Sequence, residues 1–277
     1  MKKFLWGFIF LCLIFIMLLV HGYNENRSLD VDELTIRLPD LPDNLDQLKI
    51  VHLSDIHFPK NRIDPDQLIK ETQKADPDVI FLTGDLIDRS ASIEDVPLAE
   101  LIRSLSQIAP TYSVSGNHET SSRQLDQWND IMTENGAVLL ENNTHIATLS
   151  GEKIAIMGVK DGNQTSMIPL SEDIKELPIL LLAHRPEFFP SYTTDNPDIQ
   201  PDVTFSGHAH GGQIRLPFIG GLFAPGQGFF PKYTSGIYSS SQNADQKLVV
   251  SRGIGNSLFP LRINNKPHFI VITLTNQ

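Results

Sequence analysis

The chain has 277 residues, of which 40% are hydrophobic and 20% charged, and its formal net charge is −11. This length and composition predict a globular protein with a sizeable core, in one large domain or two small ones. The acidic balance excludes the basic footprint of a nucleic-acid-binding protein, so an anionic substrate would need a local attraction such as bound metal ions.

The N-terminus begins with Lys2 and Lys3, and residues 4–20, FLWGFIFLCLIFIMLLV, carry no charge. This run is long enough for a short membrane-spanning helix, and no A-x-A-like cleavage site follows it. We therefore expect a signal anchor over residues 1–24. The alternative is a cleaved signal peptide that releases a secreted or cell-wall-associated protein. The lysines favour a cytoplasmic N-terminus, which places the remainder of a single-pass membrane protein outside the cytoplasm.

Cys12 is the only cysteine, and it lies inside the apolar run. Disulfides and cysteine-based metal sites are therefore excluded from the rest of the chain.

After this run, residues 25–46 are predicted to form a tether with an edge strand at 33–39, and a domain is expected over 47–277. Its first part alternates strands (48–55, 77–85, 111–119) with helices (64–75, 93–109, 121–136), which indicates a parallel sheet. Asp64 is expected to cap the first helix, and Ser121 and Gln124 are expected to form a capping box on the third.

After Gly136 the sequence becomes mostly strand-like. An α/β fold with two mixed sheets and helices outside would accommodate this order. The expected strands cover residues 137–142, 145–150, 153–159, 178–184, 202–208, 212–217, 236–240, 247–253 and 267–275.

Five expected strands end in residues that can bind metals: SDIH (54–57), GDLIDR (84–89), GNHE (116–119), AHR (183–185) and GHAH (207–210). Sites in α/β folds form where the carboxyl ends of strands meet, so these segments are expected to converge. Residues two apart in an extended chain share a face, which predicts that Asp55 and His57 point one way together, as do His208 and His210. The flanking Gly207 would let the backbone approach closely.

The ligand types are carboxylate, imidazole and amide oxygen without thiolate, which suit Mn, Fe or Zn. The candidates are too many for one tetrahedral zinc. They fit two divalent ions about 3.5–4 Å apart that share a bridging carboxylate.

The ordered motifs D-x-H, G-D-x-x-D-R, G-N-H-E, H and G-H-x-H resemble those of the calcineurin-like metallophosphoesterases, over residues 47–277. The longer GHAHGGQIRLP and SRGIGNSLFPLRINN resemble a bacterial, membrane-associated branch of that family. This branch includes cell-wall-associated phosphoesterases and relatives that act on UDP-diacylglucosamine. The resemblance implies a four-layer αββα sandwich and a dinuclear metal centre.

It also implies a role for each motif residue. His118 would face the substrate, and Asp88, Arg89 and Glu119 would lie near the centre as supporting residues. The alternative for Arg89 is an ion pair at the surface. The implied metal ligands are Asp55, His57 and His210 for the first ion, Asn117, His184 and His208 for the second, and Asp85 as the bridge.

The function expected from these residues is hydrolysis of a phosphoester by a metal-bound hydroxide, with His118 protonating the leaving oxygen. The substrate would be a phosphodiester or pyrophosphate, and a lipid- or cell-envelope-linked ester would suit a membrane-anchored enzyme. Two alternatives remain open: a metal-dependent hydrolase of another bond, such as an amide, and a membrane-tethered metal-binding protein without turnover.

The remaining histidines are expected outside the site: His52 in the core, and His21, His145 and His268 without a metal role. The aromatic, glycine-rich residues 217–231 allow two interpretations. They form either a packed loop or an apolar wall beside the site, which would accept a lipid or a large leaving group.

Overall fold

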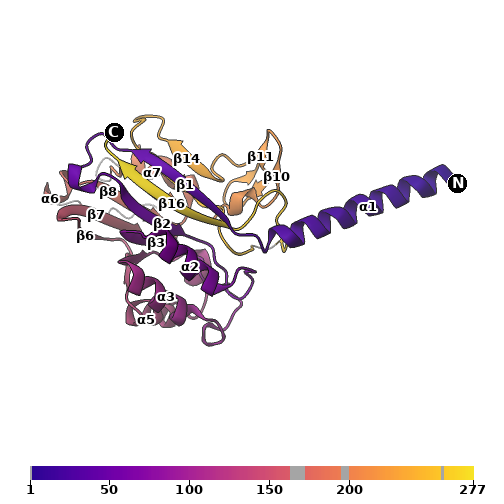
Figure 1. Ribbon diagram of the computed structural model, residues 1–277, viewed down its shortest axis with the longest axis horizontal. Coiled ribbons are helices and arrows are strands. Elements are labelled where there is room, and N and C mark those ends of the chain that lie inside the picture. The colour runs from indigo at the N-terminus through magenta and orange to yellow at the C-terminus, as the bar shows by residue number, and fades with distance from the viewer. Residues whose placement is uncertain (1, 163–171, 195–199, 257–258) are drawn as a thin grey trace.

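The computed structural model describes residues 2–162, 172–194, 200–256 and 259–277. Two stacked mixed sheets form the body, and helix α1 (Lys2–Glu25) projects away from it (Figure 1). Within the C-terminal motif SRGIGNSLFPLRINN, Ser257 and Leu258 lie outside the described residues.

The first sheet has six strands in the order β1-β16-β2-β3-β4-β5. β2, β3, β4 and β5 are parallel to one another, as the alternating pattern predicts, whereas β16 runs antiparallel to β2 and parallel to β1. The strands are β1 (Asp30–Arg37), β2 (Leu48–Leu53), β3 (Val79–Leu82), β4 (Thr111–Ser113), β5 (Ala137–Leu139) and β16 (His268–Thr275).

Three helices cover the outer face of this sheet: α2 (Pro65–Ala75), α3 (Leu98–Ile108) and α5 (Leu125–Glu134) (Figure 1). Their apolar faces bury residues such as Leu68 and Trp128 against the sheet. Amphipathic helices are held mainly by such burial, because their own propensity is modest.

The second sheet also has six strands, in the order β14-β15-β9-β8-β7-β6, and its outer strand pairs are antiparallel. Short helices, α6 (Glu172–Lys175) and α7 (Phe189–Thr193), accompany it in place of long ones. The predicted α/β sandwich is therefore confirmed, with a thinner helical layer on this side. The strands are β6 (Asn143–Leu149), β7 (Glu152–Val159), β8 (Ile179–Ala183), β9 (Val203–Ser206), β14 (Gly236–Ser239) and β15 (Lys247–Val250).

The main core lies between the two sheets. Fully buried side chains from both meet there, including Ile50 and Phe81 from the first sheet and Leu182 and Phe205 from the second. Strands buried on both faces read as continuous apolar runs, which explains the sequences of β3 and β8.

The helix boundaries follow local capping. Asp64 caps α2, because its side chain accepts the Asp66 N–H at 3.0 Å, as expected. The expected capping box of Ser121 and Gln124 is wrong. A short helix α4 (Asn117–Ser121) comes first, the Ser121 hydroxyl donates to the Asn117 carbonyl at 2.5 Å, and α5 starts at Leu125 without a side-chain cap.

Two small hairpins replace the longer strand expected at 212–217. One pairs β10 (Arg215–Leu216) with β11 (Gly220–Gly221), and the other pairs β12 (Phe223–Ala224) with β13 (Gly228–Phe229). Glycines with positive φ, such as Gly220 (φ 89°), allow these tight turns. Single 3₁₀ turns, η1 to η4, cover Asp43–Leu45, Ile93–Asp95, Pro186–Phe188 and His210–Gly212.

Candidate metal centre

The carboxyl ends of β2, β3 and β4 in the first sheet meet those of β8 and β9 in the second. The segments that follow these strands bring the eight side chains singled out from the sequence to one place. All of them are buried except Asn117, which is partly exposed. The eight are Asp55, His57, Asp85, Asn117, His118, His184, His208 and His210.

The paired ligands at 55 and 57, and at 208 and 210, do not lie on extended strands. The extended-strand argument is wrong, because β2 ends at Leu53 and β9 at Ser206, before the candidate ligands begin. Asp55 and His57 have φ values of 50° and 52°, and His208 and His210 have 63° and 46°. The left-handed backbone at these residues, and not strand alternation, directs each pair into the site.

One group of ligand atoms gathers around Asp55, His57 and His210. Nε2 of His210 lies 3.2 Å from Nε2 of His57 and 3.3 Å from Oδ1 of Asp55. Oδ2 of Asp85 is 3.6 Å from Nε2 of His57. Four potential donor atoms thus face a common point.

A second group gathers around His184. Its Nε2 lies 3.2 Å from Oδ1 of Asn117, 3.2 Å from Nδ1 of His208 and 3.4 Å from Oδ2 of Asp85. Nδ1 of His184 donates to the Thr83 carbonyl at 2.7 Å, so Nε2 is the ring nitrogen that faces the other side chains of this group.

Asp85 belongs to both groups. Its Oδ2 is within 3.6 Å of Nε2 of His57 and 3.4 Å of Nε2 of His184, whereas its Oδ1 accepts the backbone N–H of His118 at 2.8 Å. A carboxylate oxygen between two sets of imidazoles is the arrangement that a shared ligand requires.

The electrostatics fit bound cations. Burial lowers the pKa of His57 to about 3 and that of His210 well below its usual value, so both rings present free lone pairs at neutral pH. Burial raises the pKa of Asp55 to about 6. Burial also disfavours the charged form of His184, but Asp85 outweighs it and raises the pKa to about 10. Lone pairs and buried carboxylates that face one another favour positive charge between them, which the protonated His184 supplies in the free protein and which bound metal ions would supply in its place.

Two glycines make room for these side chains. A Cβ on Gly207 would lie 1.9 Å from Oγ of Ser54 and 2.1 Å from Oδ2 of Asp55. A Cβ on Gly116 would lie 2.2 Å from Oδ1 of Asp85. Both positions therefore need the close backbone approach that only glycine permits.

His118 lies at the edge of both groups: its ring centre is 4.4 Å from that of His57, and its Nε2 is 4.0 Å from Oδ2 of Asp85. The backbone N–H of Arg89 donates to Nδ1 at 3.1 Å, so a neutral ring carries its proton on Nε2. The Arg89 guanidinium also lies 3.1 Å from Nε2. Two donors that face each other in this way favour an anionic oxygen beside them.

Asp88 and Glu119 organise the neighbouring loops. The carboxylate of Asp88 accepts from Lys60 at 2.7 Å and lies 3.4 Å from Nδ1 of His118. Glu119 is fully buried and accepts three backbone N–H groups, from Asp85, Ile87 and Gly116, at 2.8 to 3.1 Å. Glu119 thereby fixes the loop after β3 to the loop after β4.

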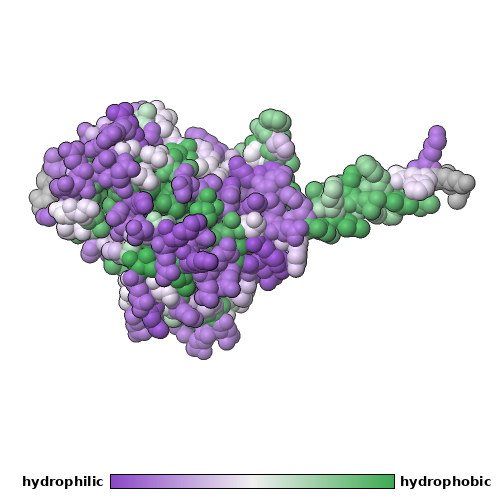
Figure 2. Space-filling model, viewed as in Figure 1, coloured by the Kyte–Doolittle hydropathy of each residue, from purple (hydrophilic) through white to green (hydrophobic). Residues whose placement is uncertain are grey.

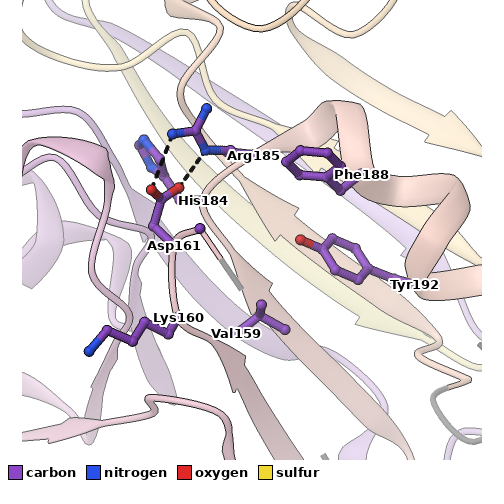
Figure 3. A pocket seen from close by; sticks show the side chains of 8 residues that line it. Val159, Lys160, Asp161, His184, Arg185, Phe188 and Tyr192 are labelled. Carbon is purple, nitrogen blue, oxygen red and sulfur yellow. Dashed lines mark hydrogen bonds and ion pairs between the residues drawn. The ribbon is translucent and has the colours of Figure 1, made fainter. Parts of the chain in front are cut away.

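The sequence interpretation missed residues that follow β7 and His184. Arg185 donates to the carboxylate of Asp161 through two hydrogen bonds, at 2.6 and 3.1 Å, and this pair lies beside His184 in a small pocket (Figure 3). Its Nη1 is 3.4 Å from Nε2 of His208, and Oε1 of Glu187 is 3.8 Å from the same atom. The signal for Asp161 was an acidic residue two positions after the end of β7, the same spacing as that of Asp55 after β2.

Arg262 was also missed, although it lies in the C-terminal motif. Its guanidinium is fully buried, donates to the carbonyls of Arg252 and Gly255, and lies 3.5 Å from Nδ1 of His210. Burial lowers its pKa to about 9. Arg262 thus supports the back of the His210 ring.

The other histidines lie outside both groups. His52 is fully buried, bonds to the Thr83 hydroxyl at 2.8 Å and packs edge-on against Phe205, as expected for a core residue. His268 is buried against Asp32 at 2.7 Å, and His21 contacts Asn264 at the base of α1.

Comparison with known proteins agrees with this geometry. Residues 48–212, more than half of the chain, match the family model described as calcineurin-like phosphoesterase. The chain is 32% identical over 259 residues to the Bacillus subtilis protein named uncharacterized metallophosphoesterase YkuE, which covers 91% of this chain and 87% of that protein. It is 29% identical over 248 residues to phosphodiesterase YaeI of Escherichia coli, with 86% of each chain covered.

A Danio rerio transmembrane protein with a metallophosphoesterase domain is 27% identical over 93% of this chain and 60% of that protein. The match to the family model, the relatives and the strand-end motifs agree, and the chain belongs to the metal-dependent calcineurin-like phosphoesterase family.

Proposed function

We propose that this protein hydrolyses a phosphodiester or a pyrophosphate at a centre of two divalent metal ions. The observation that carries the proposal is the position of Asp85, whose Oδ2 lies within 3.6 Å of His57 on one side and 3.4 Å of His184 on the other. A single ion would not need ligands on both sides of one carboxylate oxygen.

The ligand sets follow from the two groups of side chains. Bound there, two divalent ions, with Mn, Fe or Zn suited to these ligands, would supply an activated water and neutralise charge on the phosphoryl group. The chain itself is acidic, so this local positive charge would also attract the anionic substrate. The proposed ligands are Asp55, His57 and His210 on one side, Asn117, His184 and His208 on the other, and Asp85 between them.

His118 is proposed to act on the leaving oxygen. The Arg89 N–H occupies Nδ1, so the proton on Nε2 faces the space beside Asp85. Burial lowers the pKa of His118, and the ring is therefore largely neutral in the free protein at pH 7. A phosphate anion beside Nε2 would raise that pKa and favour the protonated ring as the proton donor.

The name of one relative supports a diester. The Escherichia coli protein YaeI is named a phosphodiesterase, and its similarity spans 86% of this chain. Hydrolysis of an amide, or metal binding without turnover, is less well supported. The His118–Arg89 pair beside the two groups has no purpose in a metal store, and it suits an oxyanion better than an amide.

Two findings support association with a membrane: α1 is long and apolar enough to cross one, and a relative is named a transmembrane protein. We propose that residues 1–24 are a single-pass anchor, residues 25–46 the tether and edge strand, and 47–277 the catalytic domain outside the cytoplasm. Lys2 and Lys3 before the apolar run support this orientation.

The test is to purify the full chain in detergent, measure its metal content, and assay bis-nitrophenyl phosphate, nitrophenyl phosphate and a nucleotide pyrophosphate with Mn, Fe or Zn. We expect two ions per chain and faster hydrolysis of the diester or the pyrophosphate than of the monoester. Two bound ions without turnover of any ester would overturn the proposal and favour a metal-binding protein.

A further inference from the structure

The two hairpins from β10 to β13 expose an unusual group of apolar side chains. We call them the aromatic flap. Phe218 at its tip is fully exposed, at 109%, and Phe229 and Phe230 are 71% and 63% exposed. The flap comprises Leu216, Phe218, Ile219, Phe223, Phe229 and Phe230.

This exposure is local. Among the described residues outside α1, the other large exposed apolar side chains are Phe259, which lies next to the flap, and the scattered Val31, Ile146 and Ile237. Single exposed apolar residues are ordinary, whereas a contiguous group marks a surface that meets another apolar phase. The packed-loop interpretation of residues 217–231 is therefore wrong for these side chains.

The flap and the base of α1 lie on the same side of the body. Figure 1 places β10 and β11 on the side of the body from which α1 leaves, and Figure 2 shows an apolar projection on that side, separated from the base of the helix by a hydrophilic surface. Hydrogen bonds connect the two through residues 259–265. Asn26 at the end of α1 bonds to the Pro260 carbonyl at 2.7 Å, and the Arg215 N–H donates to the Ile263 carbonyl at 2.9 Å.

Further contacts fix this arrangement. The Glu25 carboxylate accepts the Asn265 N–H at 2.6 Å, and the Gln213 amide donates to the Phe259 and Leu261 carbonyls. The position of the flap relative to α1 is therefore set by the fold and not by a free tether.

The end of α1 also marks a membrane surface. Tyr23 is 54% exposed, and the Arg27 guanidinium lies 3.7 Å from the centre of its ring. Tyrosine and arginine at the end of an apolar helix are typical of the headgroup region, where an aromatic ring and a cation both find partners. The flap projects from the body at this same end (Figure 2).

We propose that the aromatic flap inserts into the interface of the bilayer that α1 spans, as a second membrane contact. The inference rests on the proposed anchor role of α1. The bilayer is the occupant that the structure favours, because the apolar helix and the flap leave the same side of the body and are both bonded to residues 259–265. A second copy of the chain or another protein would have to share that space with lipid.

This contact would place the metal centre close to the headgroups. A Cβ on Gly212 would lie 2.3 Å from Cα of Gly221 in β11, and Arg215 donates to the Gly211 carbonyl at 3.0 Å. The flap is thus built directly on the turn that carries His210. A phosphoester held at the membrane surface would reach the site along the flap.

The experiment measures the depth of nitroxide labels on the full chain reconstituted in phospholipid vesicles. One label is placed on the native Cys12 as a reference inside α1. In a Cys12→Ala background, a second is placed at Phe218→Cys, and a matched control at Ile146→Cys, which is 42% exposed on β6 at the far side of the body. Collision rates with oxygen and with a polar nickel complex give the depth of each label.

We expect the labels at 12 and 218 to collide more with oxygen than with nickel, and the label at 146 to collide mainly with nickel. If the label at 218 is as accessible to nickel as the label at 146 while the label at 12 lies in lipid, the insertion of the flap is overturned and the anchor role of α1 stands. A label at 218 shielded from both reagents points to a protein partner and also overturns it. A label at 12 in water overturns the anchor as well. None of these readings depends on phosphoester hydrolysis.

Discussion

Substitution of Gly207 by alanine should weaken one half of the metal centre. The new Cβ would lie 2.1 Å from Oδ2 of Asp55, whereas ordinary contact begins at 3.4 Å, so the carboxylate must move by roughly 1.3 Å. That oxygen is held by the Ser54 hydroxyl at 2.6 Å and by the His208 N–H at 3.0 Å. Gly207 has no positive φ, so the cost comes from crowding and not from backbone strain.

Ligand distances tolerate changes of only about 0.2 Å, and the loss of a supporting contact typically weakens metal affinity about 10–100-fold. We expect Gly207→Ala to bind the ion at Asp55, His57 and His210 about 10–100-fold more weakly and to retain the ion at His184. Overpacking should also lower its free energy of unfolding by about 1–3 kcal/mol.

The assay is a titration of the metal-free protein with Mn or Zn against a chromophoric chelator, together with diester hydrolysis at rising metal concentration. Gly151→Ala is the control, because its Cβ meets nothing within 4 Å; its φ of 85° adds a backbone cost that Gly207→Ala does not have, so the control tests whether lost stability alone weakens metal binding. Two ions bound by Gly207→Ala with unchanged affinity would refute the reasoning.

Three further predictions test the centre, the core and the orientation, and a fourth tests the proposed acid. Asp85→Asn should lower the metal content measured by mass spectrometry more than the loss of any single terminal ligand, and two retained ions with full activity would exclude a bridging role. His118→Asn should keep both ions, lose about 10²–10⁴-fold on alkyl esters and much less on nitrophenyl esters; an equal loss on both would exclude proton donation. Burial lowers the pKa of His52 to about 3, so its contribution to stability is complete above pH 6.5 and is lost as pH falls toward 3. Both His52→Gln and the unchanged protein are unfolded with denaturant in the presence of a metal chelator. Below pH 5.5, the free energy of unfolding of His52→Gln should fall by about 1.4 kcal/mol less per pH unit than that of the unchanged protein, and equal slopes would contradict this. A reporter after residue 277 should be active only outside the cytoplasm, and full protection from added protease in intact protoplasts would reverse the orientation.

Many of the helices and strands can be predicted from the sequence, because their apolar residues follow regular patterns. The continuous apolar runs of β3 and β8 and the capped start of α2 at Asp64 predict their own structure. The strand order does not follow from these patterns. Nothing local indicates that β16 inserts between β1 and β2, because that pairing joins residues more than two hundred positions apart.

The site shows the same division. The residue types and their places after strands predict which side chains meet. The directions in which these side chains point depend on backbone φ values that could not be predicted from the sequence. Left-handed φ values at Asp55 and His208 are unusual for non-glycine residues and follow from the surrounding loops. Glu119 could be placed near the centre by its motif, whereas its three backbone partners required the three-dimensional structure.

The proposed metal ligands come from both sheets, and this has a consequence for folding. The Asp55 carboxylate accepts a hydrogen bond from His208, 153 positions away in the chain, and His57 is equally far from His210. Such a centre cannot form in either half alone, and separating the sheets would divide every ligand set. Metal ions that bind only when the two sheets are packed together would stabilise the folded state. The free energy of unfolding should therefore rise with the logarithm of the free metal concentration once this concentration exceeds the dissociation constant. Without metal, the protein would then be both inactive and easier to unfold.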